Sequence, residues 1–121
     1  MDRATFESLV AEAVRGLPEE FSEKLDNVVV MVEDFPASED LIELGIPDRS
    51  MLFGLYRGIP RSTRPRGYQG VTPDIISVYM LPVLSVCRTP EEVRAKVTDV
   101  VIHEIAHHFG ISDEEIEQIK N

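Results

Sequence analysis

The segment from His103 to Asp113 holds side chains whose types and spacing suit metal-assisted catalysis. His103 and His107 lie four residues apart, so on an α-helix both imidazoles share one face and can bind one zinc ion. Glu104 lies near the same face, where its carboxylate can accept a proton from a metal-bound water. The pattern H-E-x-x-H therefore predicts a zinc site that carries its own general base.

A third protein ligand is predicted shortly after the second histidine. Gly110 can end the helix in a left-handed conformation, so the chain turns back and Asp113 can reach the metal. Three protein ligands and an open position are typical of catalytic zinc. After Ser112, however, Asp113 also falls in the first turn of a helix, where the helix dipole favours an acid. Both roles stay open for Asp113, and they are compatible.

Other side chains have weaker assignments. His108 points about 100° around the helix from His107, which favours packing or support of a ligand over metal binding. Tyr68 and Tyr79 are candidate donors to an oxyanion, although an aromatic side chain with a satisfied hydroxyl is the more common role. The loop from residue 58 to 70 carries three arginines that either gather an acidic substrate or are solvated charges, namely Arg61, Arg64 and Arg66.

The metal motif needs a helix that fixes it in the core. Thr89-Pro90-Glu91-Glu92 is a capping box with proline at the first helical position, which predicts a helix that runs to Phe109 and ends at Gly110. Its apolar residues cover a wide arc, so we expect this helix to be central. Ser112 and Glu115 form a second capping box, which predicts a short terminal helix.

The rest of the chain predicts a small mixed sheet and one further long helix. Apolar residues recur at helical spacing between Phe6 and Leu17 and predict a first helix, with Thr5 or Asp2 as its cap and with Gly16 and Pro18 closing it. Strands are predicted at 28–32, 51–56 and 74–80. The unbroken apolarity of the first strand predicts cover on both of its faces. A short helical turn at 38–44, capped by Ser38 and closed by Gly45, and a connecting segment at 81–87 complete an α+β domain.

Composition limits the classes of function. A chain of 121 residues is expected to form a single domain, residues 1–121. The formal net charge of −10 argues against nucleic-acid binding through phosphates and favours solubility. The single cysteine, Cys87, excludes an intramolecular disulfide, suits a reducing compartment, and has the apolar neighbours of a core thiol. No signal peptide or membrane-spanning run is visible, so we expect a cytoplasmic protein without a membrane partner.

The motifs together resemble a family of short bacterial zincin-like metallopeptidases. The resemblance rests on Leu-Phe-Gly-Leu-Tyr-Arg-Gly, Pro-Asp-Ile-Ile and Val-Ile-His-Glu-Ile-Ala-His-His-Phe-Gly, and covers roughly residues 27–118. H-E-x-x-H-x-x-G-x-x-D is also similar to metzincin motifs, with Asp113 where most metzincins have a third histidine. The resemblance to the short bacterial family implies a minimal zincin domain. In such a domain a sheet of about three to four strands packs on an N-terminal helix and a buried H-E-x-x-H helix.

Two functions follow from these residues. The first is a zinc-dependent peptidase that binds one zinc ion, uses Glu104 as general base, and takes a peptide or protein substrate as an added strand along a sheet edge. The alternative is a catalytically silent zinc-binding module that binds a partner or regulates one, suggested by the small size of the domain. A purely structural metal site is disfavoured, because such a site has no need of Glu104.

Overall fold

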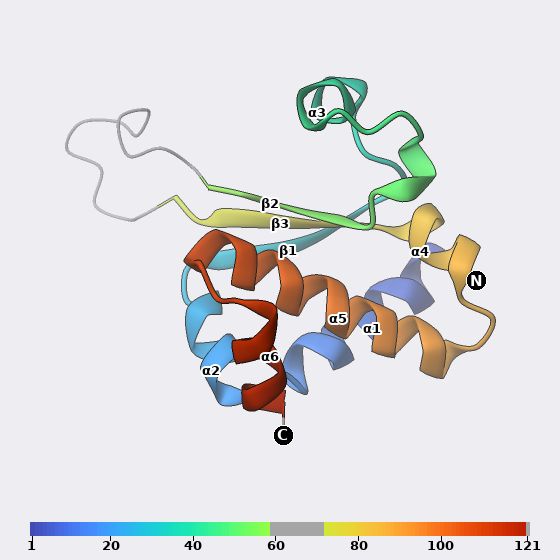
Figure 1. Ribbon diagram of the computed structural model, residues 1–121. Helices are drawn as coiled ribbons and strands as arrows, with labels where there is room; N and C mark the ends of the chain where they lie inside the picture. Colours follow the sequence, from blue (N-terminus) through green and yellow to red (C-terminus); the bar gives the residue numbers. More distant parts are fainter. Residues whose placement is uncertain (59–71, 121) are drawn as a thin grey trace.

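The computed structural model describes residues 1–58 and 72–120 (Figure 1). The predicted candidate Tyr68 and the three loop arginines lie outside these residues. Two short 3₁₀ turns, Glu23–Leu25 and Arg49–Met51, accompany the main elements. In chain order these are α1 (Arg3–Arg15), α2 (Glu19–Ser22), β1 (Val28–Glu33), α3 (Ser38–Leu44), β2 (Gly54–Arg57), β3 (Asp74–Tyr79), α4 (Met80–Val86), α5 (Pro90–Phe109) and α6 (Asp113–Lys120).

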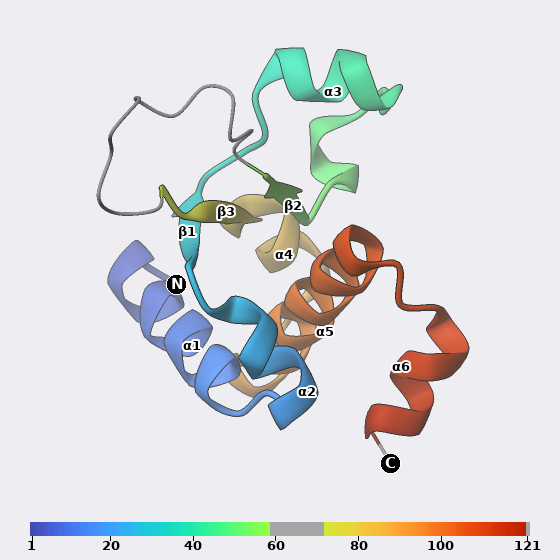
Figure 2. The ribbon, with the colours of Figure 1, turned by 90° about the vertical axis from the view of Figure 1, so that its left-hand side faces the viewer.

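The described strands form one mixed sheet in the order β1-β3-β2. β1 pairs with β3 in parallel, and β2 pairs with β3 antiparallel. Figures 1 and 2 show that α1, α2, α5 and α6 lie on one side of this sheet, whereas α3 lies on the other. The predicted α+β architecture with a small mixed sheet is confirmed.

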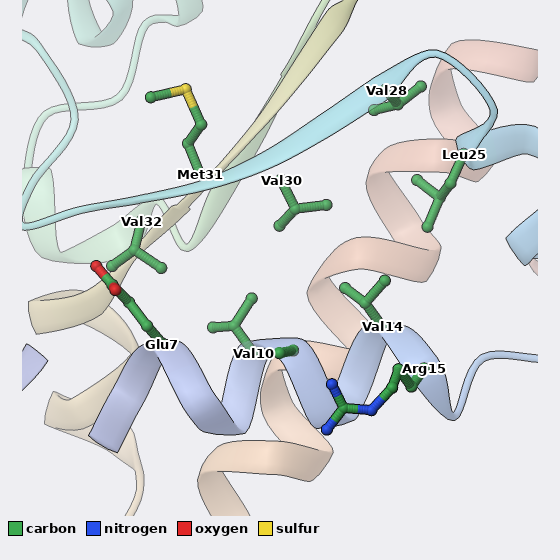
Figure 3. A pocket seen from close by; sticks show the side chains of 10 residues that line it. Glu7, Val10, Val14, Arg15, Leu25, Val28, Val30, Met31 and Val32 are labelled. Carbon is green, nitrogen blue, oxygen red and sulfur yellow. The ribbon is translucent and has the colours of Figure 1, made fainter. Parts of the chain in front are cut away.

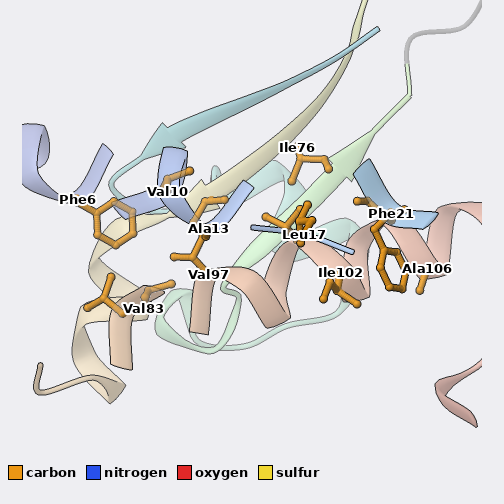
Figure 4. Close-up of a cluster of buried hydrophobic side chains, with 14 of the residues drawn as sticks. Phe6, Val10, Ala13, Leu17, Phe21, Ile76, Val83, Val97, Ile102 and Ala106 are labelled. Atoms are coloured by element: carbon orange, nitrogen blue, oxygen red, sulfur yellow. The ribbon is translucent and has the colours of Figure 1, made fainter. Parts of the chain in front are cut away.

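The core lies between the sheet and the pair α1 and α5. Phe6 and Ala13 of α1 meet Val97 and Ile102 of α5, beneath Ile76 of β3 (Figure 4). All of these side chains are buried. Full burial of one such large apolar side chain contributes about 1.5–3 kcal/mol, so this layer holds α5 firmly under the sheet.

Local signals set the bounds of α5 as predicted. Thr89 Oγ1 accepts a hydrogen bond from Glu92 N at 3.1 Å, and Gly110 ends the helix with a φ of 72°. The second capping box also forms, since Ser112 Oγ accepts from Glu115 N at 3.1 Å. No helix in the described parts of the chain is long and apolar enough to cross a membrane.

The expectation that β1 is covered on both faces is wrong. Its burial alternates along the strand, and the side chains of Val29 and Met31 are 43% and 45% exposed. The helices α1 and α5 cover the face that carries Val28, Val30 and Val32. The opposite face, which carries Val29 and Met31, is exposed.

Three further sequence predictions differ from the structure. Residues 81–87 were expected to be a connecting segment, but most of them belong to α4, whose first turn tolerates Pro82. Ser38 is the first residue of α3 rather than its cap, because Ala37 holds the N-cap position. The second strand starts at Gly54 rather than Met51, since a 3₁₀ turn occupies the residues before it. The short helix α2 was not anticipated.

Candidate active site

The two histidines of the motif project from the last two turns of α5. His103 is half-buried and His107 is exposed. The His103 Nδ1 lies 2.7 Å from the carbonyl oxygen of Asp99, one turn earlier. In the tautomer with a proton on Nδ1, this nitrogen donates to the carbonyl and leaves Nε2 as the lone-pair donor. A hydrogen bond of this kind orients a ligating imidazole and raises its basicity.

Glu104 connects the helix to the sheet. Its Oε1 accepts a hydrogen bond from the main-chain N–H of Tyr56 in β2 at 2.9 Å. Burial raises the pKa of the Glu104 carboxyl above its ordinary value, while the Tyr56 N–H and then His107 and His103 oppose the rise. A carboxylate that is oriented through one oxygen and has a raised pKa is well suited to accept a proton through its other oxygen.

The Tyr56 N–H lies on the side of β2 that has no neighbouring strand among residues 1–58 and 72–120. Tyr79 N–H donates to Phe53 O at 2.9 Å, so Phe53 faces β3. Main-chain groups alternate along an antiparallel ladder, which directs those of Gly54 and Tyr56 away from β3. The carboxylate of Glu104 therefore lies at the outer edge of β2, where an added strand would find its hydrogen-bonding partners.

Gly54 allows α5 to approach β2 closely. A Cβ atom at this position would lie 2.4 Å from Val100 Cγ1 and 3.1 Å from the carbonyl oxygen of Ser77. The Glu104 Cγ would also be in contact at 3.8 Å. Glycine is thus required so that the strand can lie against the metal-motif helix.

The side chain of Tyr56, two residues after Gly54 in β2, is held by a cluster of polar and aromatic side chains. The Tyr56 hydroxyl donates to Asp74 Oδ2 at 2.7 Å, and its ring stacks on His108 with centroids 3.9 Å apart and an interplanar angle of 14°. The exposed ring of Phe109 makes edge-to-face contacts with the rings of Tyr56 and His108. His108 therefore packs on β2, in agreement with the packing role predicted for it.

The third predicted ligand is not gathered with the histidines. Asp113 is exposed and lies in the first turn of α6. Across residues 1–58 and 72–120, no group of three or more His, Cys, Asp or Glu side chains is arranged to hold a metal ion. The side-chain position fits the dipole-partner role, and the ligand role of Asp113 stays a prediction.

Tyr79, one of the two candidate oxyanion donors, lies away from Glu104. Side chains alternate along β3, so Val78 shares the α5 face with Gly54, its partner in the register, and Tyr79 points to the opposite face. The Tyr79 side chain is fully buried, and its hydroxyl has no hydrogen-bond partner in the described part of the chain. Burial raises the pKa of this hydroxyl. The structure therefore does not bring Tyr79 to the site.

A cleft adjoins the motif on the N-terminal side of His103. It has a volume of about 300 Å³ and runs between the start of β2 and the middle of α5. The Lys96 Nζ lies at its margin, 4.0 Å from the centroid of the Phe53 ring. Its lining is mainly apolar and includes the predicted ligand His103 and the predicted base Glu104: Met51, Leu52, Phe53, Gly54, Lys96, Asp99, Val100, His103 and Glu104.

His103, His107 and Glu104 are suited to a zinc site, whereas the predicted third ligand, Asp113, is not gathered with them. Two imidazoles at helical spacing, one of them within hydrogen-bonding distance of the Asp99 carbonyl, and an adjacent half-buried carboxylate are the donors and base of a catalytic zinc site. A model of the zincin-like metallopeptidase family matches residues 25–121. The chain therefore belongs to the zincin-like metallopeptidase family. No match was found among curated proteins.

Sequence reasoning did not assign a role to Gly54, Tyr56 or Asp74. Their motifs were noticed, but only as strands. A glycine inside a strand pattern often marks a close approach of another backbone, which was the available signal for Gly54. The contact between Tyr56 and Glu104 joins residues 48 positions apart and had no local signal.

Proposed function

We propose that this protein is a zinc-dependent peptidase whose substrate adds as a strand to the outer edge of β2. The observation that supports this most is the hydrogen bond from Tyr56 N to Glu104 Oε1, because it places a half-buried acid at that edge. His103 and His107 would hold the metal, with Asp113 as the predicted third ligand. When bound, zinc would polarise the scissile carbonyl and lower the pKa of a water from near 16 towards about 7.

The residues of the chain divide the remaining work. Glu104 takes the proton of the attacking water on Oε2 and returns it to the leaving amine. The outward main-chain groups of Gly54 and the carbonyl of Tyr56 position the substrate backbone, while the Tyr56 N–H keeps its hydrogen bond to Glu104. The adjoining cleft accepts one side chain of the substrate, and its apolar lining by Phe53 and Val100 favours an apolar side chain.

The test is hydrolysis of a peptide library by zinc-loaded protein. Glu104→Gln is expected to keep one zinc ion and to lose at least about 10²-fold in rate, the usual contribution of general-base catalysis. Glu117→Gln, which changes an exposed acid on α6, is the matched control and should leave the rate unchanged. Equal cleavage by wild type and Glu104→Gln would exclude this mechanism.

A second candidate is a zinc-binding module without catalysis that binds or regulates a partner protein. The exposed position of Asp113, apart from the histidines, favours it. This candidate predicts stoichiometric zinc in the purified protein and no hydrolysis of any peptide pool. Turnover that depends on Glu104 would exclude it.

A further inference from the structure

The edge of the sheet opposite β2 is formed by β1, whose outward main-chain groups lack a strand partner among the described residues. Asp74 N–H donates to Asn27 O at 3.1 Å, so by the alternation of a parallel ladder Val28, Val30 and Val32 direct their main-chain groups away from β3. The Arg3 guanidinium agrees with this direction, because its Nη1 donates to Val32 O at 2.7 Å from the outer side.

An apolar groove runs along this edge. It lies between β1 and α1 and has a volume of about 700 Å³. Figure 3 shows Val30 and Val32 of β1 above Val10 and Val14 of α1. The other face of the strand exposes Val29 and Met31, so β1 is apolar on both faces. Natural sheets usually protect such an edge with lysine, proline or a covering segment, and an unprotected one tends to pair with another strand.

The ends of the groove carry opposite charges. Because α1 runs antiparallel to β1, Glu7 lines the groove beside Val32, whereas Arg15 lines it at the opposite end, on α1 beyond Val14 (Figure 3). If two copies pair β1 with β1 antiparallel about a two-fold axis near Val30, Glu7 of each copy lies towards Arg15 of the other. The groove is therefore complementary to itself in apolar lining and in charge. The backbone is complementary too, except that pairing at Val32 O requires Arg3 to give up its hydrogen bond to this carbonyl.

We propose that β1 and the β1–α1 groove form the interface of a homodimer, in which two three-stranded sheets join through antiparallel β1 strands. A second copy is the occupant that brings an opposite charge to both ends at once, in addition to Arg3, which already lies 3.9 Å from Glu7. Two-fold pairing also closes the assembly at this edge, because each copy uses its single β1 strand and no β1 edge is left for a third copy. The proposal is independent of hydrolysis at β2.

Sedimentation equilibrium of the full chain, over a range from micromolar concentrations upwards, tests the proposal. Wild type is expected to dimerise. Glu7→Arg or Arg15→Glu alone places like charges together at both ends, and should raise the dimer dissociation constant about tenfold or more. The double variant Glu7→Arg/Arg15→Glu, and an equimolar mixture of the two single variants, should both restore dimerisation. Glu7 and Arg15 are two turns apart on α1, so rescue requires contact between copies.

A second pair of variants tests the strand contact. Met31→Lys places a charge on the paired edge and should weaken the dimer, whereas Val86→Lys, at an equally exposed apolar residue of α4, should not. Amide hydrogen exchange should show Val28 and Val30 protected in the dimer and not after dilution. A monomer at every concentration, or a dimer unaffected by the charge variants and by Met31→Lys, would overturn the proposal.

Discussion

The two edges of the sheet have the same backbone chemistry and different surroundings. At β2, the outward N–H of Tyr56 is held by the carboxylate of Glu104, and imidazoles lie close by on the same helix. At β1, the outward groups face an apolar groove, and Arg3 holds the carbonyl of Val32. We therefore propose different roles for the two edges, substrate binding at β2 and pairing with a second copy at β1.

The helix beneath each edge makes this difference. α5 lies against β2 through Gly54 and supplies His103, Glu104 and His107. α1 supplies valines and two widely spaced charges to the groove beside β1. A free strand edge offers only hydrogen bonds, so its function depends on which side chains the neighbouring helix places next to it.

The largest expected effect at the β2 edge is on zinc affinity. His103→Ala or His107→Ala should weaken zinc binding by more than the roughly 10- to 100-fold that loss of a ligand's hydrogen-bonding partner costs. His108→Ala is the matched control, because its ring stacks on Tyr56 and should leave zinc binding unchanged. Titration calorimetry measures the zinc affinity of all three variants. If the three affinities were equal, His103 and His107 would not be the zinc ligands beside the β2 edge.

Gly54→Ala is expected to separate β2 from α5. The added Cβ would overlap Val100 Cγ1, and such overpacking costs about 1–3 kcal/mol. Gly45→Ala is the control, since Gly45 has a φ of 69° and open space around it, so alanine there strains only the backbone. Denaturant unfolding measures both changes. Only Gly54→Ala should also lower the rate of hydrolysis per folded molecule. If both variants lowered this rate equally, the close contact between β2 and α5 would not be needed for activity.

Tyr56→Phe removes the hydrogen bond to Asp74 and should cost about 1 kcal/mol of unfolding free energy. Burial and the Asp74 contact raise the pKa of Tyr56 to about 12. Because the unfolded chain ionises near its ordinary value of 10, wild-type stability should fall as the pH rises from 10 to 12. Tyr56→Phe should lose this component of the fall. An unchanged pH dependence in the variant would contradict the assignment.

The smallest effect on stability is expected from the contacts that Arg3 makes at the β1 edge of its own chain. Arg3 is 43% exposed and bonds to Val32 O and to Asp34 Oδ1 at 2.8 Å. Arg3→Ala should therefore cost less than about 1 kcal/mol in thermal unfolding, as is usual for exposed pairs, and leave hydrolysis unchanged. A large loss of activity would show that the two edges are coupled.

Local signals predicted much of the fold. The capping boxes at Thr89 and Ser112 and the stop at Gly110 act within one helical turn, so sequence spacing was sufficient to place the two helices of the motif. The run of valines in β1 specified a strand but not its place in the sheet. An interior and an edge strand can share such a run, and only the order β1-β3-β2 decides between them.

The site was predictable in part for the same reason. The spacing of His103, Glu104 and His107 is a property of one helix. The partners of Glu104 and the orientation of Tyr79 depend instead on the strand register, which brings together residues distant in sequence. Long-range pairing of this kind leaves no local pattern that sequence reasoning can use.

The central claim is that substrate occupies the β2 edge. Its most direct test is an NMR titration of zinc-loaded Glu104→Gln protein with a cleavable peptide, followed at the main-chain amides of both edges. The account predicts that Gly54 and Tyr56 shift with the peptide while Val28 and Val30 do not. The claim would be contradicted if only Val28 and Val30 shifted, or if the amides of neither edge shifted.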